Sequence, residues 1–254
     1  MARLPSVFIS HGSPMHALDP GAAGETWAEL GRRLGKPRAI LIASAHWETN
    51  VPMLTGNPKP ETIHDFSGFP QPLYKLRYPA PGAPDVAQRA QALLKDAAID
   101  GSRGLDHGAW APLLYMYPKA DIPVVQISVQ PASGPRHHVE VGRSLKTLSE
   151  EGVLIIGSGH MTHNLRDWAR GAGKPQPYAR EFSDWVREKM EKRDLEALAD
   201  YRSLAPHAAR AHPTEEHFLP LFFALGASGQ QGNPERIYDG IEGGVLAMDS
   251  YVFH

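Results

Sequence analysis

The sequence of 254 residues contains no cysteine, which excludes disulfide bonds, thiolate nucleophiles and cysteine-ligated metal sites. It contains no apolar run approaching the ~20 residues of a membrane span, and residues 1–10 lack the apolar region of a signal peptide. Neither sign of charge dominates, because 26 basic and 28 acidic residues leave a formal charge of −2 without a basic stripe. These absences favour a cytoplasmic protein that binds neither a membrane nor nucleic acid.

Histidine is the residue present in excess. The chain has 13 histidines, about twice the number that average composition predicts. Hydrophobic residues make up 42% and charged residues 21%, as in an ordinary globular protein with a substantial core. Since no internal repeat or charged linker divides the chain, we expect residues 1–254 to form a single domain.

Three apolar runs each end in small residues followed by histidine. The runs at residues 7–9, 39–43 and 153–156 precede His11, His46 and the pair His160 and His163, respectively. Consecutive apolar residues bounded by glycine are typical of strands buried on both faces, and small residues then let the backbone turn. Because ligands bind outside the carboxyl ends of such strands, we expect the histidines to share one site.

The remaining pattern alternates strands with helices. Further strands are predicted at residues 51–55 (beside the strand 39–46), 122–129 and, as an edge strand, 244–253. Helices are predicted at residues 24–34, 85–98, 111–117, 133–148, 178–192, 195–201 and 214–225, the last with a possible later start because Pro220 interrupts it. This order predicts a single α/β domain built in layers, with a largely parallel or mixed central sheet flanked by helices and the active site at the strand carboxyl ends. The proline-rich loop 56–84 is expected to act as a lid or binding loop over the strand carboxyl ends.

The histidines differ in their sequence context. His11 and His46 are the strongest candidates for metal ligands, and His217 precedes an apolar helix that would anchor it against the core. A helix start also keeps an imidazole neutral, as a metal requires. Polar or terminal surroundings favour structural roles for the others, which are His16, His137, His138, His207, His212 and His254. Residues 155–159 do not form a nucleophile elbow, and no H-E-x-x-H motif occurs.

Six motifs in this order resemble one known family. They are the segments 11–14 (HGSP), 44–48 (SAHWE), 64–70 (HDFSGFP), 105–110 (LDHGAW), 157–165 (GSG followed by THNL) and 216–221 (EHFLPL). Together they span nearly the whole chain and closely resemble the DOPA-dioxygenase type of extradiol ring-opening dioxygenases. That type belongs to the class III, protocatechuate 4,5-dioxygenase-like superfamily. His160 falls at a position where the motif is variable, so no role is carried over to it.

The resemblance implies a role for each matching residue. His11, His46 and His217 would hold one non-haem Fe(II) ion in a site that can also take zinc. His163 would be the catalytic acid/base and an additional metal ligand when no substrate is bound, whereas His107 would line the pocket as the second catalytic candidate. His64 and Asp65 would bind substrate from the loop that closes the pocket.

The implied reaction opens a DOPA-like catechol with O₂ to give a muconic semialdehyde. Neutral imidazoles leave the full positive charge on the ion, which favours a catecholate, and a histidine with a pKa near neutrality suits the proton transfers. Asp106 and Glu48 are candidates to orient the ligand histidines. Two alternatives remain open: a zinc-dependent hydrolase using the same histidines, and a non-catalytic binding protein of the same fold. The sequence leaves the particular catechol and the oligomeric state open.

Overall fold

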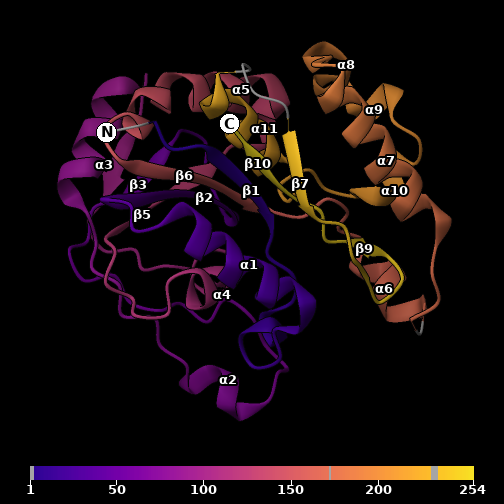
Figure 1. Ribbon diagram of the computed structural model, residues 1–254, viewed down its shortest axis with the longest axis horizontal. Coiled ribbons are helices and arrows are strands. Elements are labelled where there is room, and N and C mark those ends of the chain that lie inside the picture. Colours follow the sequence, from indigo (N-terminus) through magenta and orange to yellow (C-terminus); the bar gives the residue numbers. More distant parts are fainter. Residues whose placement is uncertain (1–2, 172, 230–233) are drawn as a thin grey trace.

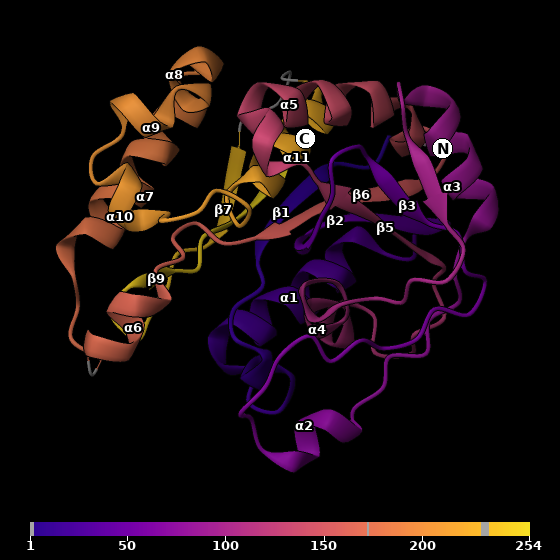
Figure 2. The same ribbon diagram turned by 180° about the vertical axis from the view of Figure 1, so that it is seen from behind.

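The centre of the protein is a mixed β-sheet between two layers of helices (Figures 1 and 2). The computed structural model describes residues 3–171, 173–229 and 234–254. The sheet has eight strands in the spatial order β4 (Ala98–Asp100), β3 (Met53–Thr55), β5 (Val124–Val129), β2 (Ala39–Glu48), β6 (Val153–Gly159), β1 (Ser6–Ser10), β10 (Ser250–Phe253) and β7 (Pro234–Tyr238). A separate antiparallel pair comprises β8 (Ile241–Glu242) and β9 (Leu246–Ala247).

The four middle strands β5, β2, β6 and β1 run parallel to one another. Their carboxyl ends therefore lie along one edge of the sheet. Alternate residues of these strands point to opposite faces. Ile40 and Ile42 of β2 pack in the cluster that contains Trp27 and Trp110, whereas Leu41 packs in a second cluster with residues of the opposite helices. Burial of both faces explains the nearly continuous apolar runs of the sequence.

Helices cover both faces of the sheet. One face is covered by α1 (Gly21–Leu34) and α4 (His107–Met116). The other face is covered by α3 (Pro84–Leu93), α5 (Gly134–Leu145) and α11 (Leu219–Ser228). Short 3-10 turns occur at Pro14–Ala17, Pro131–Ser133 and Lys146–Ser149. None of the described helices has both the length and the apolar character that crossing a membrane requires.

A third helical group lies beside the sheet, at the right of Figure 1. It comprises α6 (Leu165–Gly171), α7 (Pro177–Glu191), α8 (Leu195–Ala199), α9 (Tyr201–Leu204) and α10 (Ala208–Ala211). Phe182 and Tyr201 from this group share an apolar cluster with Phe218 and Phe222 at the start of α11. This packing fixes the segment that carries His217.

The structure confirms the predicted α/β fold with a mixed sheet and corrects several elements. The predicted helix 85–98 ends at Leu93, because Asp96 adopts a positive φ of 57° and the following residues form β4. The predicted strand 51–55 shortens to β3 and pairs with β5 and β4 instead of β2. The tail strand β10 is not at the edge, because it lies between β1 and the unpredicted β7.

Two further corrections concern the segments around the predicted site. The last helix begins at Leu219, since proline is tolerated only in the first turn, so His217 lies just before α11. The loop 56–84 contains one short helix, α2 (Gln71–Lys75). Both ends of the loop lie near the amino end of β5, where Gly82 forms a β-bridge with Val124. Only its middle part reaches the opposite edge of the sheet.

Candidate metal centre and active site

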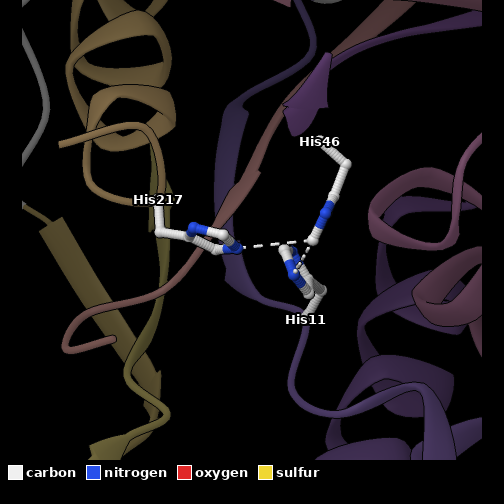
Figure 3. Close-up of side chains that lie close together, drawn as sticks. All are labelled: His11, His46 and His217. Atoms are coloured by element: carbon white, nitrogen blue, oxygen red, sulfur yellow. Dashed lines mark hydrogen bonds between the residues drawn. The ribbon is translucent and has the colours of Figure 1, made fainter. Parts of the chain in front are cut away.

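Three histidines from distant parts of the chain converge at the carboxyl edge of the parallel strands (Figure 3). His11 follows β1, His46 lies near the end of β2, and His217 precedes α11. The Nε2 atom of His46 lies 3.0 Å from Nε2 of His11 and 3.3 Å from Nε2 of His217. The backbone N–H of His160, just after β6, donates to the carbonyl of His217 at 2.7 Å and so attaches the third histidine to the sheet.

The hydrogen bonds on the far side of each ring assign its tautomer. His217 Nδ1 lies 2.8 Å from a carboxylate oxygen of Glu216, which can only accept. The Ser158 hydroxyl donates to the carbonyl of Gly108 at 2.5 Å, so at 3.0 Å it accepts the proton of His11 Nδ1. His46 Nδ1 lies 3.3 Å from Asp65 Oδ2. Each Nδ1 therefore carries a proton, and each Nε2 presents a bare lone pair to the other two.

This arrangement fits a metal ion. Nitrogens that each lie about 2.1 Å from one ion are about 3.0 Å apart at a right angle and about 3.4 Å apart at the tetrahedral angle. The observed separations of 3.0 and 3.3 Å lie in that range. Three lone pairs this close repel one another unless a cation lies between them. Because metal-ligating histidines characteristically donate their other ring N–H to an acceptor, the triad can hold a metal ion.

Burial keeps the three rings neutral. It lowers the pKa of His11 and His217 well below the usual range, and repulsion from the neighbouring imidazoles adds to the effect. Burial, followed by the nearby His107, also lowers the pKa of His46 to about 3. A neutral imidazole is the form that binds a metal, so no proton has to be displaced near neutral pH.

The ring of His163 lies against the triad but is not one of its three converging ligands. Its ring stacks on that of His217 with the centroids 3.5 Å apart and the planes at 12°. Burial, followed by repulsion from His46 and His107, lowers the pKa of His163 to about 3, whereas the sequence argument expected a value near neutrality. The ring is thus neutral and able to accept a proton, and a catecholate anion beside it would raise its pKa again.

The middle of the long loop reaches the triad through Asp65. The Asp65 carboxylate accepts from the backbone N–H of His107 at 2.9 Å and from His107 Nδ1 at 2.8 Å. Burial opposes ionisation of Asp65, but the hydrogen bond and the electrostatic interaction with His107 outweigh it and lower the pKa of Asp65 to about 2. A single carboxylate therefore orients both His46 and His107.

His64 does not face the triad, contrary to the expectation for this loop. Its Nε2–H donates to the carbonyl of Leu76 at 3.1 Å, and its ring packs against Phe66 and Trp110. The ring is thus held within the loop. Of the two neighbouring residues assigned to substrate binding, Asp65 lines the cavity at the triad and His64 does not.

Asp106 and Glu48 are not the residues that orient the ligand rings. Asp106 is fully buried as the N-terminal cap of α4, accepts from Ser44 Oγ at 2.6 Å, and has its pKa raised by burial. Glu48 lies in a separate cleft of about 590 Å³ that it shares with Glu216, and burial followed by repulsion from Glu216 raises its pKa. The bonds described above assign the orienting role to Asp65, Ser158 and Glu216. Of these three residues, Glu216 is the one that the sequence could have identified, because it directly precedes His217.

His160 is a residue of the site to which the sequence assigned no role. It is buried, its ring lies 5.1 Å from that of His11 at 84°, and it lines the same cavity. Its Nδ1 has no hydrogen-bond partner among the described residues. The strand-end pattern predicted that His160 would lie near the shared site, but the family motif is variable at this position, so the sequence assigned it no role.

These residues line one cavity of about 440 Å³. Its histidine side comprises the triad together with His107, His160 and His163. Its other side is formed by apolar residues from the turn after β1, the long loop, α6 and β9. A pocket with a few convergent polar groups and an apolar wall is typical of a small-molecule site.

Comparisons with known proteins point to one family. Residues 5–246 match the family described as the catalytic LigB subunit of aromatic ring-opening dioxygenase. The chain is 43% identical to a 4,5-DOPA dioxygenase extradiol of Beta vulgaris, over 97% of this chain and 95% of that protein. It is 40% identical to the protein of that name from Escherichia coli strain K12, over 97% and 93% of the two chains. A crystal structure of an uncharacterized Escherichia coli K12 protein superimposes with a TM-score of 0.84 at 34% identity, covering 99% of this chain and 100% of that one.

Proposed function

The chain belongs to the LigB family of ring-cleaving dioxygenases, and from this premise we propose that it opens the ring of a substituted catechol with Fe(II) and O₂. The product would be a muconic semialdehyde that contains both oxygen atoms of O₂. The relatives named 4,5-DOPA dioxygenase point to catechols as the substrate class. His11, His46 and His217 would hold the ion.

The observation that carries this proposal is the tautomer assignment of the triad. Three neutral imidazoles with bare Nε2 atoms offer three ligands on one side and add no negative charge. A metal ion held by these three side chains would keep room for substrate and O₂ and would supply the redox chemistry that triplet O₂ requires. Proton transfer and positioning of the substrate would be carried out by side chains of the protein.

His163 is the proposed base. Its neutral ring stacks on His217 and borders the cavity, so a catechol hydroxyl bound at the triad would lie within its reach. The ring would accept that proton and return it as the carbon ring opens. When no substrate is bound, His163 would turn towards the triad and act as a further metal ligand, because its ring already lies 3.5 Å from that of His217.

His107 and the loop would position the substrate. Asp65 fixes the protonated Nδ1 of His107, which leaves Nε2 of this second catalytic histidine to accept a hydrogen bond from the substrate. Asp65 would contribute to substrate binding by holding His107 in place, whereas His64 would act indirectly by holding the loop through Leu76. Zinc could occupy the same three ligands, but it cannot activate O₂.

The proposal is tested by separating the ligands from the base. In the protein loaded with Fe(II), His46→Ala should lose the metal and hence all oxygen uptake with a catechol. His163→Ala should retain the metal and lose about 10²–10⁴-fold in turnover rate, the usual contribution of a general base. Bound iron, anaerobic catechol binding and oxygen uptake are measured for each variant, with the exposed His254→Ala as the control.

Three results would contradict parts of this assignment. Loss of iron from His163→Ala as complete as that from His46→Ala would make His163 mainly a ligand. Full turnover by His163→Ala would transfer the role of base to another residue, and His107 would be tested next. Absence of oxygen uptake with every catechol by the iron-loaded protein would refute the dioxygenase itself.

We also propose that residues 1–254 act as one ring-cleavage domain. The first strand β1 and the last strand β10 pair in the same sheet, so the two ends of the chain contribute to one central sheet. The metal ligands likewise come from both ends of the chain, at His11 and His217. A fragment lacking either end would lose part of the sheet and one ligand.

A further inference from the structure

An aromatic wall extends outward from the catalytic histidines. The ring of Phe66 lies 5.6 Å from that of His107 in an edge-on contact. Phe69 follows, with its centroid 5.3 Å from that of Phe66. Both phenylalanines line the cavity, so this wall continues directly from the place where a catechol ring would bind.

The opposite wall consists of apolar residues that are exposed to solvent. In the part of the chain that the structure describes, five large apolar side chains are exposed, and two of them, Leu165 (57%) and Trp168 (37%), line this cavity. They lie one turn apart on α6 and therefore share a face. The Trp168 ring packs over Gly243, where a Cβ would come within 3.0 Å of it, so the ring is held in place.

Charged groups are scarce in this cavity. Among its described lining residues there is no lysine or arginine, and Asp65 is the single carboxylate. That carboxylate already accepts two hydrogen bonds from His107 and lies 3.3 Å from His46 Nδ1. The cavity therefore offers no cation to a substrate carboxylate and no unengaged anion to a substrate ammonium group.

We propose that the substrate is a catechol whose ring substituent is uncharged and apolar, and that Phe66, Phe69, Leu165 and Trp168 bind this substituent. The inference rests on the proposed ring-opening function and narrows its substrate class. An amino-acid substituent such as that of DOPA would bring two charges into a cavity that pairs neither of them. An alkyl or aryl substituent would instead cover the two exposed side chains of α6.

The test compares four catechols with a side chain of similar length and different charge. They are 4-propylcatechol, the cationic dopamine, the anionic 3-(3,4-dihydroxyphenyl)propanoate and the zwitterionic DOPA. The kcat/KM of the iron-loaded protein should be highest for 4-propylcatechol and roughly tenfold or more lower for each charged compound, because unpaired charges lose hydration. The zinc-loaded protein, which does not turn over, should bind the four compounds with the same order of affinity, so 4-propylcatechol should have the lowest dissociation constant.

Variants of the exposed cavity residue Leu165 test which side chains produce the preference for an apolar substituent. Leu165→Ala should reduce kcat/KM for 4-propylcatechol by roughly two- to fourfold more than for unsubstituted catechol, as expected for loss of about one buried methylene contact. Leu204→Ala is the matched control, because this leucine is equally exposed at 57% and lies on α9 outside the cavity. Leu165→Lys should shift the preference towards the anionic propanoate by introducing the missing cation.

The outcomes separate this inference from the proposed function. Equal or better turnover of DOPA than of 4-propylcatechol would overturn the inference and leave the dioxygenase intact. Effects of Leu204→Ala as large as those of Leu165→Ala would also overturn it. If none of the four catechols bound to the zinc-loaded protein or consumed oxygen with the iron-loaded one, the proposed function would fail and this inference with it.

Discussion

Loss of stability at mildly acidic pH is a consequence of the buried histidines, and His212 offers the clearest test. His212 is fully buried outside the metal triad, and its ring stacks on Phe218 with centroids 4.7 Å apart. Its Nε2–H donates to the carbonyl of Met161 at 2.8 Å, whereas its Nδ1 has no hydrogen-bond partner in the described part of the chain. Burial lowers its pKa to about 3. Protonation would therefore place an uncompensated charge in the core.

The sign and size follow from proton linkage. The unfolded histidine titrates near pH 6.5, so below that pH the unfolded state binds a proton that the folded state refuses. Stability is therefore fully present above the unfolded pKa and is lost as the pH falls. Between about pH 7.5 and about pH 5.5, one such histidine reduces the free energy of unfolding by about 1.3 kcal/mol. This change in the free energy of unfolding is nearly the same for any pKa of His212 in the folded state below about 4.5.

The assay is urea unfolding of the metal-free protein at both pH values, because protons and metal compete for the ligand histidines. His212→Gln removes the titrating group and retains a donor for Met161. We expect the stability difference between the two pH values to shrink by about 1.3 kcal/mol in this variant. His254→Gln at the exposed carboxyl end should retain most of the wild-type difference. An unchanged difference in His212→Gln would refute the argument from burial.

Two further predictions concern metal affinity and packing. Asp65→Asn replaces a carboxylate acceptor by an amide and should weaken metal binding about 10–100-fold in competition with a chelator, whereas affinity equal to the wild type would show that His46 needs no anionic partner. Gly157→Ala would place a Cβ on the carbonyl oxygen of Pro220 and should destabilise the fold by more than about 3 kcal/mol or prevent it. Gly101→Ala, where the added Cβ meets nothing, is the control in thermal unfolding, and equal effects of the two glycine variants would contradict the packing argument.

The positions of His11 and His46 could be derived from the sequence because they depend on a local pattern. An apolar run predicts a buried strand, and parallel strands bring their carboxyl ends to one edge. The resemblance to the dioxygenase family added His217, whose place in the chain alone does not reveal its neighbours. In the structure, the Nε2 atoms of His11 and His217 lie 3.0 and 3.3 Å, respectively, from Nε2 of His46.

The elements that could not be derived depend on non-local pairing. The strand β7 has weak alternation and exists because β10 supplies its partner, which in turn moves β10 away from the sheet edge. The same applies to the residues that orient the ligands. Ser158 and Asp65 belong to different segments from the rings they contact, so no spacing along the chain identifies them. Asp106 was a reasonable candidate by sequence, but capping of α4 determines its position.

The two glycines of β6 connect the fold to the site. The sequence argument expected small residues after Ile156 to let the backbone turn, but β6 continues through Gly159. A Cβ on Gly157 would overlap the carbonyl of Pro220, and one on Gly159 would overlap that of His217. Because these two glycines have no Cβ, the start of α11 can lie directly against the strand, where the N–H of His160 donates to the carbonyl of His217. The third ligand therefore reaches the triad only after α11 has packed on the sheet, so the metal site depends on completed tertiary structure.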